Sequence, residues 1–225
     1  MNVAYNMDCM EYMRTLPDKA FDLAVVDPPY GIGESGSKNH TRGKLAVAKN
    51  YKAFAGNDIQ PPSPMYFEQL IRVSTNQIIF GANHFADKIP NPASSCWIVW
   101  DKENGNTDFA DCELAWTSFK SAVRIFRFRW QGMLQGNMAD KEQRIHPTQK
   151  PVALYTWIYQ RYAKPGDKIL DTHLGSGSSR IAAYDAGLDF VGCEIDPDYF
   201  RAQEERFRVH TAQENLFLQE EQENG

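Results

Sequence analysis

Long apolar runs are missing from this chain of 225 residues. No stretch approaches the roughly 18 apolar residues that a membrane-spanning helix needs. Residues 1–16 also lack the basic segment and apolar stretch of a secretion signal, so we expect neither a membrane protein nor a secreted one. Hydrophobic residues still make up 42% of the chain, enough for a sizeable core and too many for disorder over most of its length.

Cysteines are few and scattered. The chain has four of them, with no C-x-x-C pair and no histidine close enough in sequence to complete a zinc site. We therefore expect reduced thiols in a cytoplasmic protein and no metal.

An excess of positive charge is also lacking, since 24 Lys and Arg residues stand against 29 Asp and Glu residues, a net charge of −5. This excludes a basic footprint over the whole chain, but the charges are unevenly distributed. Residues 35–57 carry five basic residues and no acidic one, residues 120–150 have a net charge of +5, and residues 204–225 have a net charge of −4. The two positive segments are either solvated loops or surfaces that bind phosphates.

The order of apolar runs and helical patterns predicts an α/β fold. The last third has a strand, a glycine turn, a helix, a strand and a helix, which is the nucleotide-binding half of a doubly wound sheet. That half needs a third strand, yet the chain is polar after Arg208, so we expect residues 2–8 to supply it. We predict strands at 2–5, 21–26, 77–80, 96–100, 114–118, 123–128, 168–170 and 190–194, and helices at 9–16, 65–74, 151–162, 179–186 and 198–208.

The glycine turn lies within residues 171–179. Gly175 and Gly177 allow the backbone to approach a ligand closely, and Glu194 at the end of the next strand is placed to accept hydrogen bonds from ribose hydroxyls. Arg180 occupies the position of the third glycine of the dinucleotide fingerprint, which disfavours a nicotinamide enzyme. The pattern indicates an adenosine-containing cofactor, the alternative being an ordinary tight turn.

A second motif, Asp27-Pro28-Pro29-Tyr30, directly follows a buried strand. The two prolines fix two φ angles, remove two N–H donors and leave the Pro28 carbonyl pointing outward. An acid, a free carbonyl and an aromatic ring are thus held at the carboxyl end of a strand, where α/β sheets bind their ligands. The alternative is that this segment is only a stiff turn.

These groups suit methylation of an aromatic amine, which is a poor nucleophile because its lone pair is delocalised into the ring. Hydrogen bonds from the two amine hydrogens to the Asp27 carboxylate and the Pro28 carbonyl favour a localised pair. The Tyr30 ring can stack on an extruded base, worth about 1 to 3 kcal/mol. A sulfonium methyl group held over the glycine turn is the electrophile. No cysteine follows a proline, which argues against a covalent route to carbon 5 of cytosine.

Three motifs in this order, residues 27–30, 146–151 and 171–178 with Glu194, resemble the S-adenosylmethionine-dependent amino-methyltransferases of DNA. They are most similar to the β-type adenine-N6 enzymes, in which the catalytic motif precedes the cofactor motif. The resemblance covers residues 2–208 and implies a single-domain Rossmann-like methyltransferase fold with a mostly parallel, circularly permuted, doubly wound sheet. It implies catalytic roles for Asp27, Pro28, Pro29 and Tyr30, and a cofactor site of Asp8, Cys9, Lys150, Asp171, His173, Gly175, Ser176, Gly177, Ser178 and Glu194.

The implied partner is double-stranded DNA, and the resemblance leaves a homodimer open. We expect residues 1–210 to form the domain and residues 211–225 an acidic polar tail. Segments 31–58 and 100–145 remain for DNA recognition, and we expect residues 31–57 to be mobile without DNA and ordered with it. The basic candidates for DNA contact are Lys38, Arg42, Lys44, Lys49, Arg127 and Arg129.

One departure from the family pattern is Thr172-His173, where the family usually has Pro-Phe; His173 either replaces that apolar wall or is a hydrogen-bonded turn residue. The alternative reaction is methylation of cytosine N4, whose relatives usually begin the catalytic motif with Ser. RNA or a protein amide as substrate fits less well, because those relatives usually begin it with Asn. A methyltransferase-like DNA-binding subunit without activity is the alternative from another class. We expect the chain to act in the prokaryotic or phage-infected cytoplasm, associated with the nucleoid through DNA.

Overall fold

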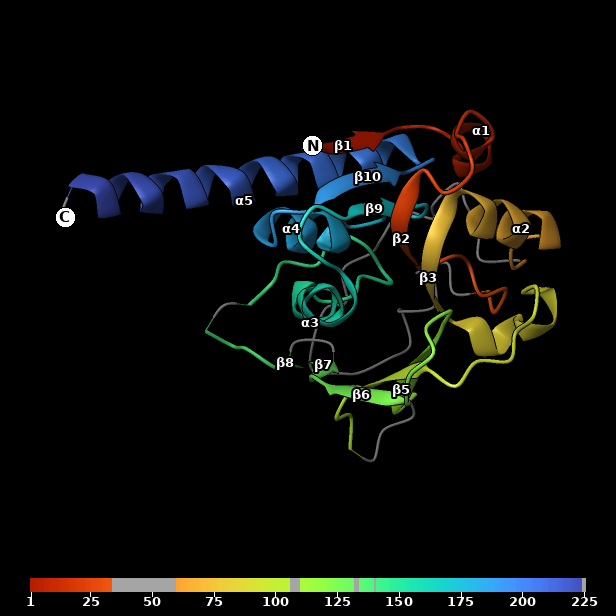
Figure 1. Cartoon of the computed structure of the whole chain (residues 1–225). Helices are drawn as coiled ribbons and strands as arrows, with labels where there is room; N and C mark the ends of the chain where they lie inside the picture. Colours follow the sequence, from red (N-terminus) through yellow and green to blue (C-terminus); the bar gives the residue numbers. More distant parts are fainter. Residues whose placement is uncertain (34–59, 106–109, 132–133, 140, 224–225) are drawn as a thin grey trace.

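The computed structural model describes residues 1–33, 60–105, 110–131, 134–139 and 141–223, with the backbone alone over 214–223. Its centre is an eight-stranded sheet in the order β1-β10-β9-β2-β3-β5-β4-β6 (Figure 1). The strands are β1 (Asn2–Tyr5), β2 (Phe21–Val26), β3 (Ser74–Phe80), β4 (Trp97–Asp101), β5 (Cys112–Thr117), β6 (Arg124–Arg127), β9 (Lys168–Asp171) and β10 (Asp189–Cys193), and a separate ribbon pairs β7 (Trp130–Gln131) with β8 (Leu134–Gln135). The helices are α1 (Cys9–Arg14), α2 (Pro64–Val73), α3 (Val152–Tyr162), α4 (Ser178–Asp185) and α5 (Pro197–Glu223), with the 3₁₀ turns η2 (Ala82–His84) and η3 (Ala86–Lys88).

The sheet confirms the predicted fold class and the permuted order. Five neighbouring strands, from β1 to β3, are parallel, and β5 lies antiparallel between β3 and β4. The first strand of the chain pairs with β10, with Asn2 opposite Phe190 and Tyr5 opposite Cys193. The amino terminus therefore supplies the strand that the cofactor half lacks.

The centre of the sheet is a topological switch point. Strands β9 and β2 are neighbours there, with Ala24 opposite Leu170. From β9 the chain continues outward to β10, and from β2 it continues to β3 on the other side. In open α/β sheets, ligands bind where the connections leave in opposite directions, which in this sheet is at the carboxyl ends of β9 and β2. Both predicted motifs begin at these two strand ends.

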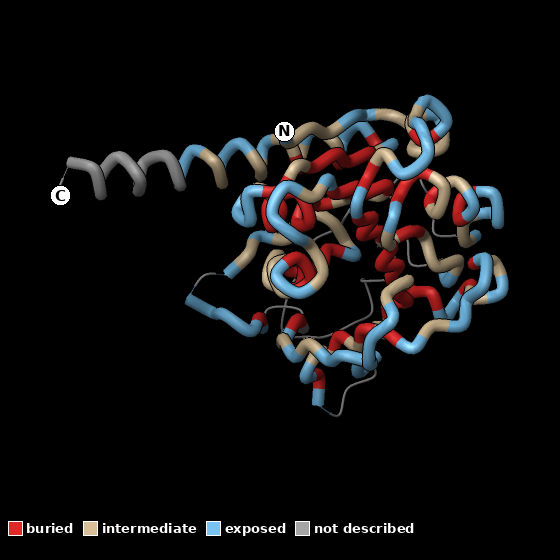
Figure 2. Tube along the Cα trace, viewed as in Figure 1, coloured by how far each residue is buried: buried red, intermediate tan, exposed pale blue. Residues whose placement is uncertain are grey.

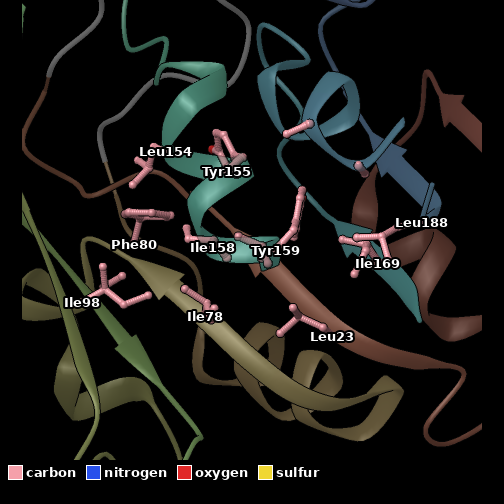
Figure 3. Close-up of a cluster of buried hydrophobic side chains, with 14 of the residues drawn as sticks. Leu23, Ile78, Phe80, Ile98, Leu154, Tyr155, Ile158, Tyr159, Ile169 and Leu188 are labelled. Carbon is pink, nitrogen blue, oxygen red and sulfur yellow. The ribbon is translucent and has the colours of Figure 1, made fainter. Parts of the chain in front are cut away.

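The central strands β2, β3 and β9 are apolar on both faces, and helices cover both. On one face Leu23, Ile78 and Ile169 pack beneath the α3 residues Leu154 and Ile158 (Figure 3). The opposite face of the same strands packs against α1 and α2, and buried residues run through the whole centre (Figure 2). This two-sided burial explains why β2 reads as a continuous apolar run and not as an alternating one.

The last helix is longer than the sequence predicts. We expect it to end at Arg208, but α5 continues to Glu223 and extends away from the body (Figure 1). The physical reason is that no Gly or Pro interrupts residues 198–223, where Glu, Gln, Ala and Leu favour helix. The predicted boundary between the domain and the acidic tail, at residue 210, falls inside α5. The division into a domain and a tail stays a prediction.

Arg180 is a buried link between elements. Its guanidinium donates to Asn2 Oδ1 of β1 (2.7 Å) and to Gln203 Oε1 of α5 (3.0 Å), and it pairs with Glu204. The arginine that takes the place of the third glycine therefore joins α4 to β1 and to the first half of α5. Separately, no helix among the described residues is long and apolar enough to cross a membrane.

Candidate active site

Asp27 follows β2 at the switch point, and both of its carboxylate oxygens are engaged. The Tyr30 hydroxyl donates to Oδ1 at 2.7 Å, and Lys150 Nζ donates to Oδ2 at 2.7 Å. Burial raises the pKa of the Asp27 carboxyl, and the Lys150 ammonium opposes that rise. The acid is thus held in one orientation beside a positive charge.

Lys150 lies with the catalytic motif, although the resemblance places it in the cofactor site. Its Nζ is 2.8 Å from Glu113 Oε2 as well as 2.7 Å from Asp27 Oδ2, and its side chain is only 4% exposed. On the other side of Glu113, Lys102 Nζ lies 2.5 Å from Oε1, so that Lys102, Glu113, Lys150 and Asp27 form a row of alternating charges. The sequence reasoning missed Glu113 and Lys102: the predicted strand begins at Leu114, whereas β5 begins at Cys112 and includes Glu113.

The Tyr30 ring is enclosed by the chain after β3. It stacks on His84 of η2, with centroids 5.2 Å apart and planes at 17°. It also lies against Gly81, which has a φ of +68°; a Cβ there would be 2.1 Å from Tyr30 Cε1. Only glycine allows this approach. We expect the Tyr30 ring to offer a face to a base, and in this structure His84 occupies a stacking position on it.

The glycine turn connects β9 to α4, with a φ of +51° at Gly175 and +74° at Gly177. The Gly175 N–H donates to Glu194 Oε2 at 2.8 Å, and the Asp196 N–H donates to Oε1 at 2.9 Å. Glu194 is therefore held between the turn after β9 and the loop after β10. Asp171, at the start of the motif, accepts from the Ser179 hydroxyl and from the His173 N–H, and burial raises the pKa of its carboxyl to about 7.

Arg206 of α5 forms hydrogen bonds with the glycine turn. Its Nη1 donates to the Ser176 carbonyl (2.8 Å) and to Ser178 Oγ (2.9 Å), and its Nη2 donates to Glu142 Oε2 (2.7 Å). The other oxygen of Glu142 accepts from the Val152 N–H at the start of α3. Sequence reasoning did not single out Arg206, because nothing in a polar helical segment marks one arginine as partly buried.

His173 is half-buried beside Tyr66 of α2. Its Nδ1 is 2.9 Å from Thr172 Oγ1, its ring meets the Tyr66 ring edge-on at 5.4 Å, and the Tyr66 hydroxyl is 2.6 Å from the same Thr172 oxygen. Burial lowers the pKa of His173 to about 4, so the imidazole is neutral near pH 7. Its role toward a cofactor stays a prediction.

Asp8 and Cys9 lie at the start of α1. Asp8 caps the helix, its Oδ1 accepting from the Met10 N–H at 2.6 Å. Burial and the Asp8 charge raise the pKa of the Cys9 thiol to about 12, so it stays protonated. The contacts of Asp8 and Cys9 with the cofactor stay predictions.

The residues around the glycine turn fit an adenosine-containing cofactor. Glu194 presents a carboxylate, fixed by two backbone amides, at the end of β10, where ribose hydroxyls are usually bound in this fold. Two glycines with positive φ keep side chains off the turn. Among the described residues, by contrast, no group of three or more His, Cys, Asp or Glu is arranged to hold a metal ion.

The predicted DNA contacts divide into two sets. Lys38, Arg42, Lys44 and Lys49 lie outside the described residues, as does most of segment 31–58. Arg127 and Arg129 are exposed at the carboxyl end of β6 and just after it, and Arg127 Nε is 3.4 Å from Asp101 Oδ2. Strand β6 is parallel to β4 and, through the antiparallel β5, to β3 and β2. These two arginines thus lie at the same edge of the sheet as Asp27.

The permuted sheet, with an acidic turn and a glycine turn side by side at its switch point, defines an α/β methyltransferase of the amino-methylating type. Comparison with known proteins identifies the family: a DNA methylase family model, that of the N6/N4 methylases, matches residues 83–205, and the chain belongs to this family. S-adenosylmethionine is the cofactor of this class, as the motifs imply.

Individual relatives are distant but cover most of the chain. The type II methyltransferase M.HinfI of Haemophilus influenzae is 24% identical over 92% of this chain and 68% of its own length. The crystal structure of the M1.HpyAVI–SAM complex superimposes with a TM-score of 0.58 at 22% identity, covering 92% of this chain and all of that one. The cytosine-N4-specific PvuII DNA methyltransferase has a TM-score of 0.58 at 13% identity over 92% of this chain and 86% of its own.

Proposed function

We propose that this chain transfers a methyl group from S-adenosylmethionine to the exocyclic N6 amine of adenine in double-stranded DNA. The observation that carries the proposal is the Asp27 carboxylate, held by Tyr30 and Lys150 at the switch point next to the glycine turn. An acid in that position can act on a substrate amine while the cofactor occupies the neighbouring strand ends. The family supplies the coarser assignment, an N6/N4 DNA methylase.

The chain's own residues act on the amine. The Asp27 carboxylate and the Pro28 carbonyl accept hydrogen bonds from its two hydrogens, which favours a lone pair localised on the nitrogen instead of delocalised into the ring. S-adenosylmethionine supplies the electrophilic methyl group when bound. As the N–C bond forms and the bond from the methyl group to sulfur breaks, its electron pair staying on sulfur, Asp27 is also placed to hold the proton that the amine loses. Burial of Asp27 favours this proton transfer because it raises the pKa of the carboxyl.

The amine is accessible only if the base leaves the duplex stack, so we propose base flipping, at a cost of a few kcal/mol. The flipped base stacks on Tyr30 after displacing His84, which is exposed and can move aside. Asp27 favours adenine because the cytosine-N4 relatives usually begin the motif with Ser. Cytosine N4 is the second candidate, since a neighbour of this fold is a cytosine-N4 enzyme.

Arg127 and Arg129 are proposed to contact DNA phosphates. They lie at the active-site edge, four strand positions from β2, which is about 19 Å at roughly 4.8 Å per strand. A duplex bound over this edge can therefore reach both Asp27 and the arginines. The homodimer and the location in a prokaryotic or phage-infected cytoplasm stay predictions.

Replacing both Arg127 and Arg129 by Ala is expected to weaken DNA binding and to reduce its salt slope by up to about 0.9 for each phosphate that is no longer neutralised. Binding of duplex DNA is measured by fluorescence anisotropy at several salt concentrations. Arg124→Ala is the matched control, because Arg124 is exposed at the opposite end of the same strand. If the control changes the slope as much as the double variant does, DNA binding is not confined to the site edge.

Glu194→Gln is expected to raise the Kd and KM of S-adenosylmethionine about 10- to 100-fold with little change in kcat, since hydrogen bonds to a charged acceptor contribute about 1.5–3 kcal/mol. A glutamine also offers one acceptor where the Gly175 and Asp196 N–H groups need two. Calorimetry and steady-state kinetics measure both constants, with the exposed Glu205→Gln as control. A fall in kcat alone would refute the ribose assignment.

The function is tested by incubating the protein with unmethylated genomic DNA and S-adenosylmethionine labelled in its methyl group. We expect label in the DNA with the wild-type chain and none with Asp27→Asn, which keeps the side-chain shape but removes the charge. Total RNA and a bulk protein mixture serve as alternative acceptors. Label in either of these, with none in DNA, would overturn the proposal.

A further inference from the structure

A buried ammonium links the catalytic acid to a second carboxylate. Lys150 Nζ lies 2.7 Å from Asp27 Oδ2, 2.8 Å from Glu113 Oε2 and 3.1 Å from the Tyr30 hydroxyl. A lysine that is only 4% exposed requires such partners, because an unpaired ammonium is expensive to bury. Asp27 alone leaves one side of this ammonium unpaired, and Glu113 fills that side.

Glu113 is in turn fixed from its other oxygen. Its Oε1 lies 2.5 Å from Lys102 Nζ, just after β4, while its Oε2 accepts from Lys150 and is 3.4 Å from the Tyr30 hydroxyl. Charges of alternating sign therefore run from Lys102 through Glu113 and Lys150 to Asp27. The row joins the ends of β4 and β2, the start of β5 and the segment before α3. These elements approach one another only in the folded sheet.

We propose that Glu113 is a positioning residue for methyl transfer, which orients Asp27 by holding Lys150 between the two carboxylates. The inference rests on the proposed role of Asp27 toward the substrate amine. A carboxylate oxygen has two lone-pair directions. With Lys150 on Oδ2 and Tyr30 on Oδ1, the remaining lone pairs of Asp27 point in set directions and can accept an amine hydrogen. If Lys150 is released, those directions are no longer set.

The charges of the row support each other. Burial opposes the charged form of Glu113, but Lys150 and Lys102 outweigh it and hold the pKa of this carboxyl at about 2, so Glu113 stays ionised. Burial likewise opposes the charge on Lys150, and Asp27 and Glu113 raise the pKa of its ammonium. The other titratable groups that act on Asp27 or Lys150 are Tyr30, Tyr66, Tyr155, Asp171 and His146. Burial raises the pKa of Asp171 to about 7 and lowers that of His146 to about 4, so His146 is neutral near pH 7. The charge of Lys150 thus depends on two carboxylates.

The test is Glu113→Gln, with single-turnover methylation of DNA followed from pH 6 to pH 10. We expect the rate at neutral pH to fall about 10- to 100-fold, since misplacing a reacting group by about 1 Å costs on this order. The high-pH limb, the loss of rate as Lys150 deprotonates, lies above this range in the wild type, since Asp27 and Glu113 raise the pKa of its ammonium. In Glu113→Gln we expect this limb to move to lower pH, toward the measured range, because one carboxylate instead of two then holds the ammonium charged. Binding of S-adenosylmethionine should stay within a few-fold, and Glu113→Asp should restore part of the rate and of the pH limb.

Glu68→Gln is the matched control, because Glu68 is an exposed glutamate of α2. If Glu113→Gln does not fold, Lys102→Met keeps both the Asp27–Lys150 and the Glu113–Lys150 pairs and should move the pH limb in the opposite direction, because it removes a positive charge that competes with Lys150 for Glu113. NMR titration of lysine labelled with carbon-13 at Cε gives a readout apart from activity: the Lys150 signal should titrate at lower pH in Glu113→Gln. This readout separates failure of the inference from failure of the proposed function. An unchanged Lys150 titration together with an unchanged pH profile would overturn the positioning role.

Discussion

Asp27→Ala is expected to abolish measurable methyl transfer while leaving the Kd of S-adenosylmethionine within a few-fold of the wild-type value. Positioned acids and bases contribute about 10²- to 10⁴-fold to a rate, and Asp27 also orients the amine. The cofactor is expected to bind at the neighbouring glycine turn, where Glu194 and Gly175 hold each other at 2.8 Å without help from Asp27. The two functions are therefore separable.

Calorimetry and label transfer decide this prediction, with Asp27→Asn measured in parallel. The asparagine variant matters because removing the whole side chain leaves Lys150 with Glu113 as its main carboxylate partner and could disturb the site beyond the loss of the acid. Asp87→Ala, at an exposed aspartate of η3, is the control and should behave as wild type. Loss of cofactor binding in Asp27→Asn would show that acid and cofactor site do not act separately.

Gly81→Ala is expected to lower both stability and activity. The φ of +68° at Gly81 costs a residue with a Cβ about 1–2 kcal/mol. The added Cβ would also lie 2.1 Å from the Tyr30 ring, and overpacking of this kind typically costs about 1–3 kcal/mol. The ring must shift to relieve the clash, which disturbs the 2.7 Å hydrogen bond from Tyr30 to Asp27. We therefore expect at least a tenfold fall in kcat.

Gly166→Ala separates the two causes, since Gly166 has a φ of +85° and nothing within 4 Å of its would-be Cβ. It should show the backbone cost alone and full activity. Urea denaturation gives the free energy of unfolding of each variant, and label transfer gives kcat. Equal losses in stability and activity in both variants would show that the contact with Tyr30 is not what requires a glycine at position 81.

The sequence was most informative where one local pattern carries the structure. The apolar run of β2 and the two glycines after β9 each specify their own conformation: the strand lies at Phe21–Val26 as predicted, and both glycines have positive φ. The strand at 2–5 followed from what the last third lacked, and β1 pairs with β10 as expected. The permutation could thus be predicted from the chain order.

The charges around the acid could not be predicted in the same way. Lys150 and Asp27 are 123 residues apart, and Glu113 approaches them only when β5 adds antiparallel to β3. No local pattern states which lysine meets which carboxylate, so the resemblance could suggest a cofactor role for Lys150 but not its contact with Asp27. Arg206 was missed for the same reason, because its contacts with Ser176 and Glu142 depend on how α5 packs.

The central claim is most directly tested by identifying the methylated base. DNA modified by the wild-type chain in the presence of S-adenosylmethionine is digested to nucleosides, and the products are separated and identified by mass spectrometry against unmodified DNA. The proposal predicts N6-methyladenine as the main product and its absence from DNA treated with Asp27→Asn. N4-methylcytosine as the main product would contradict the adenine assignment, while leaving the fold and the cofactor unchanged.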